Sequence, residues 1–598
     1  MVASQPQSLK ESAPAPESGW PAPPAPAASG WPAPPPSAAA GWPEAPPPQE
    51  WPTWPQPGQP VTTRDWGTPK PKASLARSAG IVAAAFVVSR LLGLVREVVL
   101  ARQFGTSEAL GAYISAFRIP DLLFLVIMAG AFGSAFIPVF SGMLSEGEER
   151  AAWKLASVVL NLSSLAAVVT SGLAWIAAPE LVRWVVAPDA TPEIQQLTVE
   201  CMRVLLLSPV FLGLGIAAKG ILEGQDLFTL PALAPVIYNS ATILGAIFLG
   251  PRIGVLGVAV GVVAGAFGFL LVQLPGLIRS GMRYSPSLNL RTPGVGDVAR
   301  LLGPRLIGQA AFQINFIAVT NLAWRTGEQS VSALNYAWQL LMLPHGVLAL
   351  SISTVILPTL SRLWQQGDRA AFRITLGSAL KPLIFLSLPA SVVLFAFRTP
   401  IVQTLFQTGA FSSQSTALVA APLAYLAAGL VSYAVVEAMT RAFYAMHDTR
   451  TPVIVGIAIV IANLGIGLAL LPRMGYLALA LALSLSTTIE AVALGLVLWR
   501  RLGNLARSTV GWLLRVLVAT AIVGVACAAL AAPLTDITTP GTAPRVLQLL
   551  LFLGALGVVG LVYFAAAWMM DIPELSTSLG QIGRRIPGVR GVVARFSR

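Results

Sequence analysis

Charged residues are scarce in this sequence. Only 11% of its 598 residues are Asp, Glu, Lys or Arg, and 55% are hydrophobic, whereas a soluble domain usually carries roughly a quarter of charged residues. The mean hydropathy is +0.72. Charge-free stretches such as 452–471 and 551–570 are long enough to cross a hydrocarbon core of about 30 Å. The composition therefore excludes an ordinary water-soluble fold and indicates an integral membrane protein.

Cysteine and histidine are almost absent too. The chain has two of each, Cys201, Cys527, His345 and His447, so it has no disulfide framework and no predicted metal centre. It also lacks the GxxxxGK[ST] loop that holds nucleotide phosphates, the HExxH zinc motif and the GxSxG nucleophile motif. We therefore predict no catalytic residue and no cofactor. Any transport would draw on the membrane potential, an ion gradient or the substrate gradient.

The apolar stretches predict an all-α integral membrane protein of about fourteen transmembrane helices. The predicted spans cover residues 75–103, 109–143, 152–178, 193–222, 229–250, 253–278, 296–324, 329–362, 370–397, 415–445, 451–471, 475–499, 508–532 and 546–570. Basic residues cluster in every second loop, and the intervening loops carry single arginines, namely Arg102, Arg183, Arg252, Arg325, Arg398, Arg473 and Arg545. By the positive-inside rule, we predict that both termini lie in the cytoplasm. This topology accounts for the net charge of +13 without nucleic-acid binding.

Two short motifs recur along the chain. FIPVFS at 136–141 resembles ILPTLS at 356–361, an offset of 220 residues, and Asp226 resembles Asp448, each followed by a proline a few residues on. Because six predicted helices separate the two copies, both copies have the same orientation in the membrane. Transporters with parallel repeats of this kind place their binding site between the halves. We predict two six-helix lobes related by a parallel repeat, plus two C-terminal helices outside it.

The first part of the chain differs from the rest. Residues 1–72 repeat Trp-Pro units among Pro and Ala, which favours extended, polyproline-like chain over helix. This tail is either disordered without a partner or a docking segment for an aromatic groove or the membrane interface. The predicted division is a Pro/Trp-rich cytoplasmic tail at 1–72, an N-terminal lobe at 73–290, a C-terminal lobe at 291–502, two helices at 503–572 and a basic cytoplasmic tail at 573–598.

Three arginines within predicted spans are candidates for anion binding. Arg90 is a dozen or so residues into the first span, where an arginine costs about 3 kcal/mol on insertion scales. Such a residue usually faces a polar cavity or a partner, so we predict that Arg90 contacts an anion, the alternative being an ion pair with Glu97. Arg96 either reaches the same cavity or extends to the interface. Arg118, just before Pro120, is a third candidate.

Amides and carboxylates also interrupt the predicted spans. The amide candidates for the cavity lining are Gln309, Gln313, Asn335 and Gln339. Amides within membranes also link helices to one another, and the sequence leaves both roles open. Glu437 and Glu490 are candidate coupling residues for a proton or cation, although Glu437 can instead pair with Arg441 four residues on.

Several motifs together resemble the MurJ (MviN) lipid II flippases of the multidrug/oligosaccharidyl-lipid/polysaccharide exporter superfamily. The resemblance covers about residues 74–570. The motifs are SRLLGLVRE at 89–97, AFRIPDLL at 116–123, GAF at 130–132 with FIPVF at 136–140, NYA at 335–337 with LPHGV at 343–347, LFQTGAF at 405–411 and RAFYAMHDTRTP at 441–452.

The resemblance implies two lobes around a central cationic cavity, alternating access, and a groove for the polyprenyl tail formed by the last two helices. The family's first-helix arginines match Arg90 and Arg96. Some members have a sodium site for which Asn463 and Gly467 are the matching positions, so Asn463 is a third coupling candidate. The chain lacks other charges common in the family, and the positions concerned are Gly111, Phe124, Leu125, Ala129 and Gln339.

The resemblance favours a flippase that moves lipid II from the inner to the outer leaflet, with lipid II and membrane lipids as its partners. The altered cavity charges leave a second reading open, a flippase for another polyprenyl-diphosphate-linked glycan or a cation-coupled drug exporter. A third reading is a non-transporting scaffold that recruits cell-wall synthesis proteins through the Trp-Pro tail.

Overall fold

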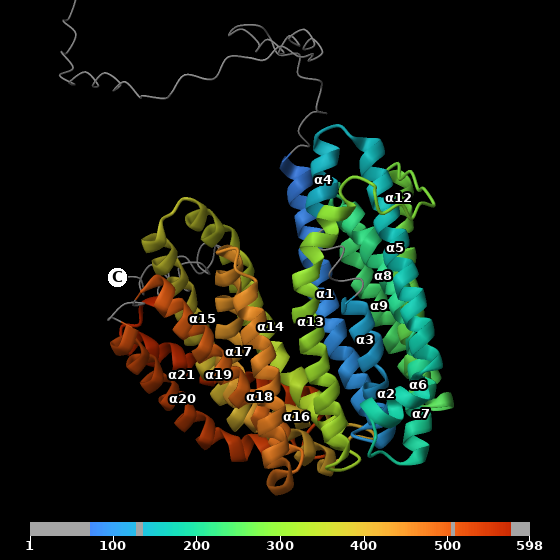
Figure 1. The fold of residues 1–598 in the computed structure, drawn as a ribbon. Helices are drawn as coiled ribbons and strands as arrows, with labels where there is room; N and C mark the ends of the chain where they lie inside the picture. The colour runs from blue at the N-terminus through green and yellow to red at the C-terminus, as the bar shows by residue number, and fades with distance from the viewer. Residues whose placement is uncertain (1–71, 127–135, 504–508, 576–598) are drawn as a thin grey trace, which may run out of the picture. The chain divides into compact units, whose positions relative to one another are not determined.

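The computed structural model describes residues 72–126, 136–503 and 509–575, all in the unit that begins at Pro71. Within these residues every regular element is a helix (Figure 1). The predicted tails at 1–72 and 573–598 and the GAF motif at 130–132 lie largely or wholly outside the described ranges.

The first group of helices, called here the N-terminal bundle, runs from blue to green in Figure 1. Its elements are α1 (Lys72–Phe104), α2 (Glu108–Ala116), α3 (Arg118–Phe124), α4 (Ile137–Ser145), α5 (Glu149–Ile176), α6 (Ala178–Leu181), the π-helix η3 (Val182–Val186), α7 (Pro192–Leu205), α8 (Ser208–Glu223), α9 (Thr229–Leu244), the π-helix η4 (Gly245–Leu249), α10 (Gly250–Ile253), α11 (Val255–Leu271) and α12 (Leu274–Arg279).

The remaining helices follow α13 (Val295–Trp324), which packs against elements of both groups. The C-terminal bundle consists of α14 (Ser330–Gln365), α15 (Arg369–Ala396), α16 (Arg398–Phe406), α17 (Ser413–Ala445), α18 (Arg450–Met474) and α19 (Leu477–Leu502). The last two helices, α20 (Thr509–Thr538) and α21 (Arg545–Met569), pack on each other and on α15 and α16 (Figure 1).

Ten helical stretches of the described residues are long and apolar enough to cross a membrane. The four other predicted spans, 75–103, 109–143, 296–324 and 329–362, fall on α1, α2 to α4, α13 and α14, which carry the polar residues of the candidate site or border a gap in the description. The membrane fold is confirmed, and the count of fourteen stays a prediction.

The helix boundaries repeat along the chain. Helices α5 and α15 each have 28 residues, and their first residues, Glu149 and Arg369, are 369 − 149 = 220 positions apart. Left-handed backbone recurs at nearly the same interval, since Asp226 (φ 60°) is followed 221 residues later by His447 (φ 58°), the neighbour of Asp448. The repeat seen in the sequence is therefore a repeat of helices and of turn geometry.

Glycine sets the packing of α11 in the N-terminal bundle. A Cβ at Gly257 would lie 2.6 Å from the backbone of Leu249, and one at Gly265 would lie 2.7 Å from the carbonyl oxygen of Tyr238. Only a residue without a side chain permits this approach of α11 to α9 and η4, as in the small-residue interfaces of other membrane helices. This packing holds α9, which carries Tyr238, in place beside the site.

Candidate functional site

The two bundles meet at the end of α1. Here the loop after α1 crosses the loop before α17, and Ala410 N donates a hydrogen bond to Arg102 O at 2.8 Å. A Cβ at Gly105 would lie 2.5 Å from Ala410 O, and one at Gly409 would overlap Arg102 O. Both glycines have positive φ, 56° and 60°, which other residues adopt only with strain. We call this crossing the closed end.

Side chains reinforce the closed end. The Thr106 hydroxyl lies 2.9 Å from that of Ser415. Ser332 Oγ donates to Ser107 O at 3.0 Å, and Arg325 pairs with Asp189 at 3.1 Å. Backbone and hydroxyl contacts thus link the two bundles at this end, and the ion pair links the N-terminal bundle to the end of α13.

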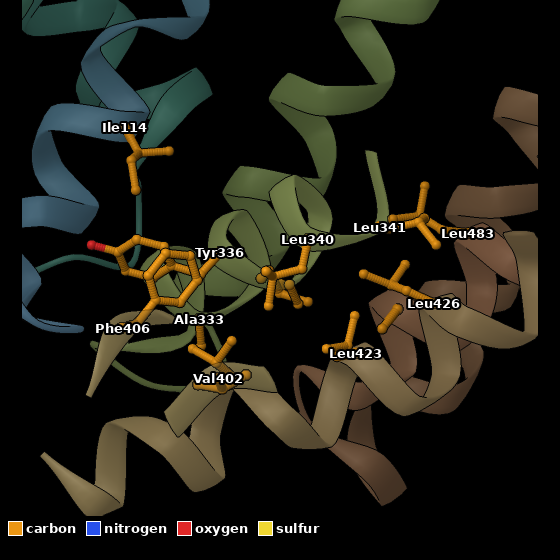
Figure 2. Close-up of a cluster of buried hydrophobic side chains, with 14 of the residues drawn as sticks. Ile114, Ala333, Tyr336, Leu340, Leu341, Val402, Phe406, Leu423, Leu426 and Leu483 are labelled. Atoms are coloured by element: carbon orange, nitrogen blue, oxygen red, sulfur yellow. The ribbon is translucent and has the colours of Figure 1, made fainter. Parts of the chain in front are cut away.

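A buried hydrophobic cluster adjoins these polar contacts (Figure 2). Ile114 of α2 lies across from Tyr336 of α14, whose ring is 5.0 Å from that of Phe406 between centroids. Leu426 of α17 and Leu483 of α19 extend the cluster through the C-terminal bundle (Figure 2) and also line a central cavity. The floor of that cavity is therefore apolar and packed.

The central cavity has a volume of about 430 Å³ and is lined from both bundles and α13. Its polar lining residues are Arg96, Glu97, Tyr113, Arg118, Asp121, Tyr238, Gln313, Thr320, Asn335, Tyr336 and Gln339. Concave sites with a few convergent polar groups are the usual form of a ligand site. Five of the seven predicted substrate-binding residues are brought together here: Arg96, Arg118, Gln313, Asn335 and Gln339.

Arg96 is held by its sequence neighbour. Its Nη2 and Nε donate to Glu97 Oε1 at 2.8 and 3.2 Å, and its Nη1 donates to Asn239 Oδ1 of α9 at 3.4 Å. Glu97 is buried. A carboxylate that accepts two charge-assisted hydrogen bonds largely offsets the cost of burying the guanidinium. Arg96 therefore contributes a positioned but mostly neutralised cation.

Arg118 is turned toward α13. Its Nε donates to Thr320 Oγ1 at 2.9 Å, and its guanidinium carbon lies 5.3 Å from the centre of the Phe316 ring. Neither contact neutralises its charge. Asp121 follows one turn later on the same helix and lines the same cavity, yet its carboxylate makes no hydrogen bond or ion pair with the part of the chain that the structure describes.

The opposite side of the cavity is uncharged. Gln313 comes from α13, and Asn335 and Gln339 come from α14, with the indole of Trp338 between them in sequence. Amides and an aromatic face suit hydroxyl and acetamido groups, since both donate and accept hydrogen bonds. Gln309 also belongs to α13, but its side chain is not among those described.

Arg90 lies outside the cavity lining. Its side chain is exposed, its guanidinium is 5.3 Å from the Phe86 ring centre, and its Nη1 lies 3.8 Å from the position a Cβ at Gly346 of α14 would take. Glu97, the alternative partner considered for Arg90, is bound by Arg96 instead. Arg90 thus stands two turns of α1 before Arg96, facing α14.

The three coupling candidates lie apart from one another. Asn463 of α18 donates to Asn315 Oδ1 of α13 at 2.7 Å in a buried amide pair. Glu437 pairs with Arg441 at 2.7 Å within α17. Glu490 is half-buried on α19 and makes no hydrogen bond or ion pair with the described residues. The structure therefore assigns Asn463 a helix-linking contact, while Glu490 stays a candidate.

Sequence reasoning missed two features of the site. Asp121 follows Arg118 by three residues, a spacing that places both on one helix face, and this could have indicated a second charge in the cavity. Gly111 stands where many family members carry an acid. A Cβ there would lie 3.1 Å from the Trp324 ring, so the glycine allows α2 to pack against the end of α13.

The chain is similar in sequence to proteins of one known family. A family model described as lipid II flippase MurJ matches residues 100–542. The chain is 32% identical over 435 residues to the lipid II flippase MurJ of Burkholderia cenocepacia. The matched region covers 71% of this chain and 84% of the relative. It is 30% identical to the probable lipid II flippase MurJ of Haemophilus influenzae, with 68% and 83% covered.

Solved structures agree with these relatives. A lipid II flippase MurJ in an inward closed conformation matches with a TM-score of 0.67 and 25% identity, over 82% of this chain and 98% of that one. An inward-facing MATE family multidrug transporter shares the fold, with a TM-score of 0.62 and 19% identity, over 70% and 95%. The chain, a multi-pass membrane transporter with a charged cavity between two bundles, belongs to the MurJ family.

Proposed function

We propose that this protein is a flippase that carries lipid II from the inner to the outer leaflet of the bacterial cytoplasmic membrane. The observation that carries the proposal is the cavity between the bundles, in which Arg96 and Arg118 lie opposite amides in a member of this family. A polar head group would otherwise have to cross about 30 Å of hydrocarbon unaided.

The two sides of the cavity suit the two parts of this cargo. Arginine guanidinium groups present paired donors that match phosphate oxygens, so Arg118, and Arg96 to a lesser degree, would bind the diphosphate. Asn335, Gln339 and Trp338 would contact the sugars. The exposed Arg90 would meet the diphosphate at an earlier point on its way to the cavity.

The predicted topology indicates toward which side of the membrane the cavity opens. With both termini in the cytoplasm, α1 runs outward, and the closed end faces the outside. The cavity is then the inward-facing, loading state. We propose that the membrane potential or an ion gradient drives the cycle, with Glu437, Glu490 and Asn463 as coupling candidates, and that the Trp-Pro tail recruits cell-wall synthesis proteins.

Reconstitution tests the proposal. Purified protein in vesicles containing fluorescent lipid II is treated with a membrane-impermeant reductant, with and without an imposed membrane potential. We expect the fraction of lipid II exposed on the far leaflet to equilibrate faster with the protein than without it. A fluorescent phosphatidylglycerol serves as the specificity control. Equal lipid II rates with and without protein, under either potential, would rule the function out.

A further inference from the structure

The described side chains of the central cavity carry balanced charges. Two arginines, Arg96 and Arg118, face two carboxylates, Glu97 and Asp121. With all four ionised, their formal charges cancel. A diphosphate diester carries two negative charges, so an anionic cargo would enter a site with no net attraction for it. Binding of an anionic cargo therefore requires that the cavity become more positive.

The two carboxylates are not equivalent. Glu97 accepts two hydrogen bonds from Arg96, so a proton on Glu97 would break an ion pair. The Asp121 carboxylate makes no hydrogen bond or ion pair with the described residues, because Arg118 is held toward α13 by Thr320 and Phe316. A carboxylate that is partly removed from water without a bonded partner is the group that most readily takes up a proton.

The neighbours of Asp121 can be named element by element. The titratable side chains that share its cavity are Arg96, Glu97, Tyr113, Arg118, Tyr238 and Tyr336. Helix α13 faces it with the uncharged Gln313, Phe316 and Thr320. Helices α5, α7 and α8 pack against α3 but contribute no residue to the lining. Asp121 is thus the one lining carboxylate in the described chain that has no bonded cation.

We propose that Asp121 is a proton-binding residue, and that the cavity takes up a proton on Asp121 when a diphosphate-linked lipid binds to Arg118. The proton comes from solvent on the loading side and binds to a carboxylate oxygen, and no other bond is made or broken. Protonation leaves the cavity with a net charge of +1 and removes the repulsion beside Arg118. The inference rests on the proposed function and adds the co-bound ion to it.

Linkage fixes the sign of the effect. If bound cargo raises the proton affinity of Asp121, protons must raise the affinity for cargo by the same factor. Affinity for lipid II then falls with rising pH, by about tenfold per pH unit once Asp121 is ionised in the empty cavity. The diphosphate diester of lipid II does not titrate near neutral pH, so the cargo itself contributes no such slope.

The experiment measures lipid II binding to the purified full-length protein between about pH 6 and pH 8.5. Calorimetry in buffers of different ionisation enthalpy also counts the protons taken up. We expect the wild type to bind more weakly at high pH and to take up close to one proton per lipid II there. Asp121→Asn should bind at least about tenfold more tightly than wild type at pH 8.5, without the slope or the proton uptake.

Two further variants keep the result interpretable. Asp121→Glu retains a carboxyl and should retain the pH slope. Glu223→Gln removes one negative charge from α8, outside the cavity, and should behave as wild type. If Asp121→Asn binds more weakly than wild type, the carboxylate is a direct ligand of the cargo and the inference is wrong. A pH-independent wild type also refutes it, whereas a wild type that binds no lipid II at any pH refutes the proposed function instead.

Discussion

At the scale of single residues, the site depends on how each arginine is paired. Arg96 donates two hydrogen bonds to Glu97 at 2.8 and 3.2 Å, whereas Arg118 donates one hydrogen bond to a neutral hydroxyl at 2.9 Å. A cation without an anionic partner gains more from an incoming phosphate, because its charge is not already compensated. We therefore expect Arg118 to be the stronger anion-binding residue, although Arg96 lies in the same cavity.

Replacement of Arg118 tests this ranking. Arg118→Ala should weaken lipid II binding about ten- to a hundredfold, which corresponds to the roughly 1.5–3 kcal/mol of a hydrogen bond to a charged group. Arg96→Ala should cost less, because Glu97 is then left without its partner and can be protonated. Thr320→Val, which removes only the hydroxyl that positions Arg118, serves as the near-isosteric control and should change affinity by about threefold or less. Equal losses for both arginine variants would contradict the ranking.

At the scale of elements, the crossing of two glycine loops closes one end of the cavity. Gly105 and Gly409 approach the opposite backbone so closely that neither accepts a side chain. Because the two loop backbones are in direct contact, we expect this end to be either closed or open, with few intermediate arrangements of the loops. The loop before α17 belongs to the LFQTGAF motif, and Gly409 of this motif lies at the crossing.

Gly409→Ala should therefore favour the open state of this end. Left-handed backbone costs alanine about 1–2 kcal/mol, and the overlap with Arg102 O is an added cost that applies only when the end is closed. Spin labels at Arg252 of α10 and Ser413 of α17, which are both exposed, would report a population at longer distance. Gly367→Ala is the matched control, because Gly367 also has positive φ (76°) but has open space around it. An unchanged distance distribution in Gly409→Ala would contradict the prediction.

Much of the architecture was predictable from the sequence, and the reasons are physical. Hydrophobic runs predict membrane-spanning helices, and alternating basic loops predict their orientation. The 220-residue offset between two short motifs reappears in the bounds of α5 and α15. The site was predictable in part. Periodicity placed Gln313 and Arg118 in spans, but a one-dimensional pattern does not reveal that Arg96 binds its own neighbour or that Arg90 faces α14.

The same limit explains the residues that were missed. Asp121 was not predicted as a site residue, and its lack of a bonded cation among the described residues depends on the turn of Arg118 toward Thr320. Asn463 was a coupling candidate because the resemblance places it at a sodium site of some family members, and the structure adds that it binds Asn315 of a helix distant in sequence. Both outcomes depend on contacts between helices that lie far apart along the chain.

At the scale of the whole molecule, transport requires the closed end to open while the two bundles keep their own packing. The contacts across that end combine polar links with a buried hydrophobic cluster that spans both bundles, and each bundle also has a hydrophobic core of its own, around residues such as Phe140 and Phe443. Separate cores of this kind are expected for rigid bodies that rock about a central site.

A disulfide across the closed end should stop the cycle without blocking loading. The hydroxyl oxygens of Thr106 and Ser415 are 2.9 Å apart, and paired cysteines at such a separation can form a disulfide. Cys201 and Cys527 are replaced by alanine in this background, so that the new pair supplies the only thiols. Oxidised Thr106→Cys/Ser415→Cys protein should bind lipid II with unchanged affinity but lose translocation in vesicles, and reductant should restore it. Oxidised Thr106→Cys alone should remain active, and full activity of the cross-linked protein would refute a required opening.

The hydrogen bond from Ala410 N to Arg102 O has a consequence for the conditions under which the protein works. Neither backbone group has a net charge, so dissolved ions do not screen this contact, whereas they weaken an exposed pair such as Arg325 with Asp189. The backbone contact at this crossing should therefore be largely insensitive to ionic strength. A change from dilute to concentrated salt would loosen the ion pair beside the crossing and leave the crossing itself closed.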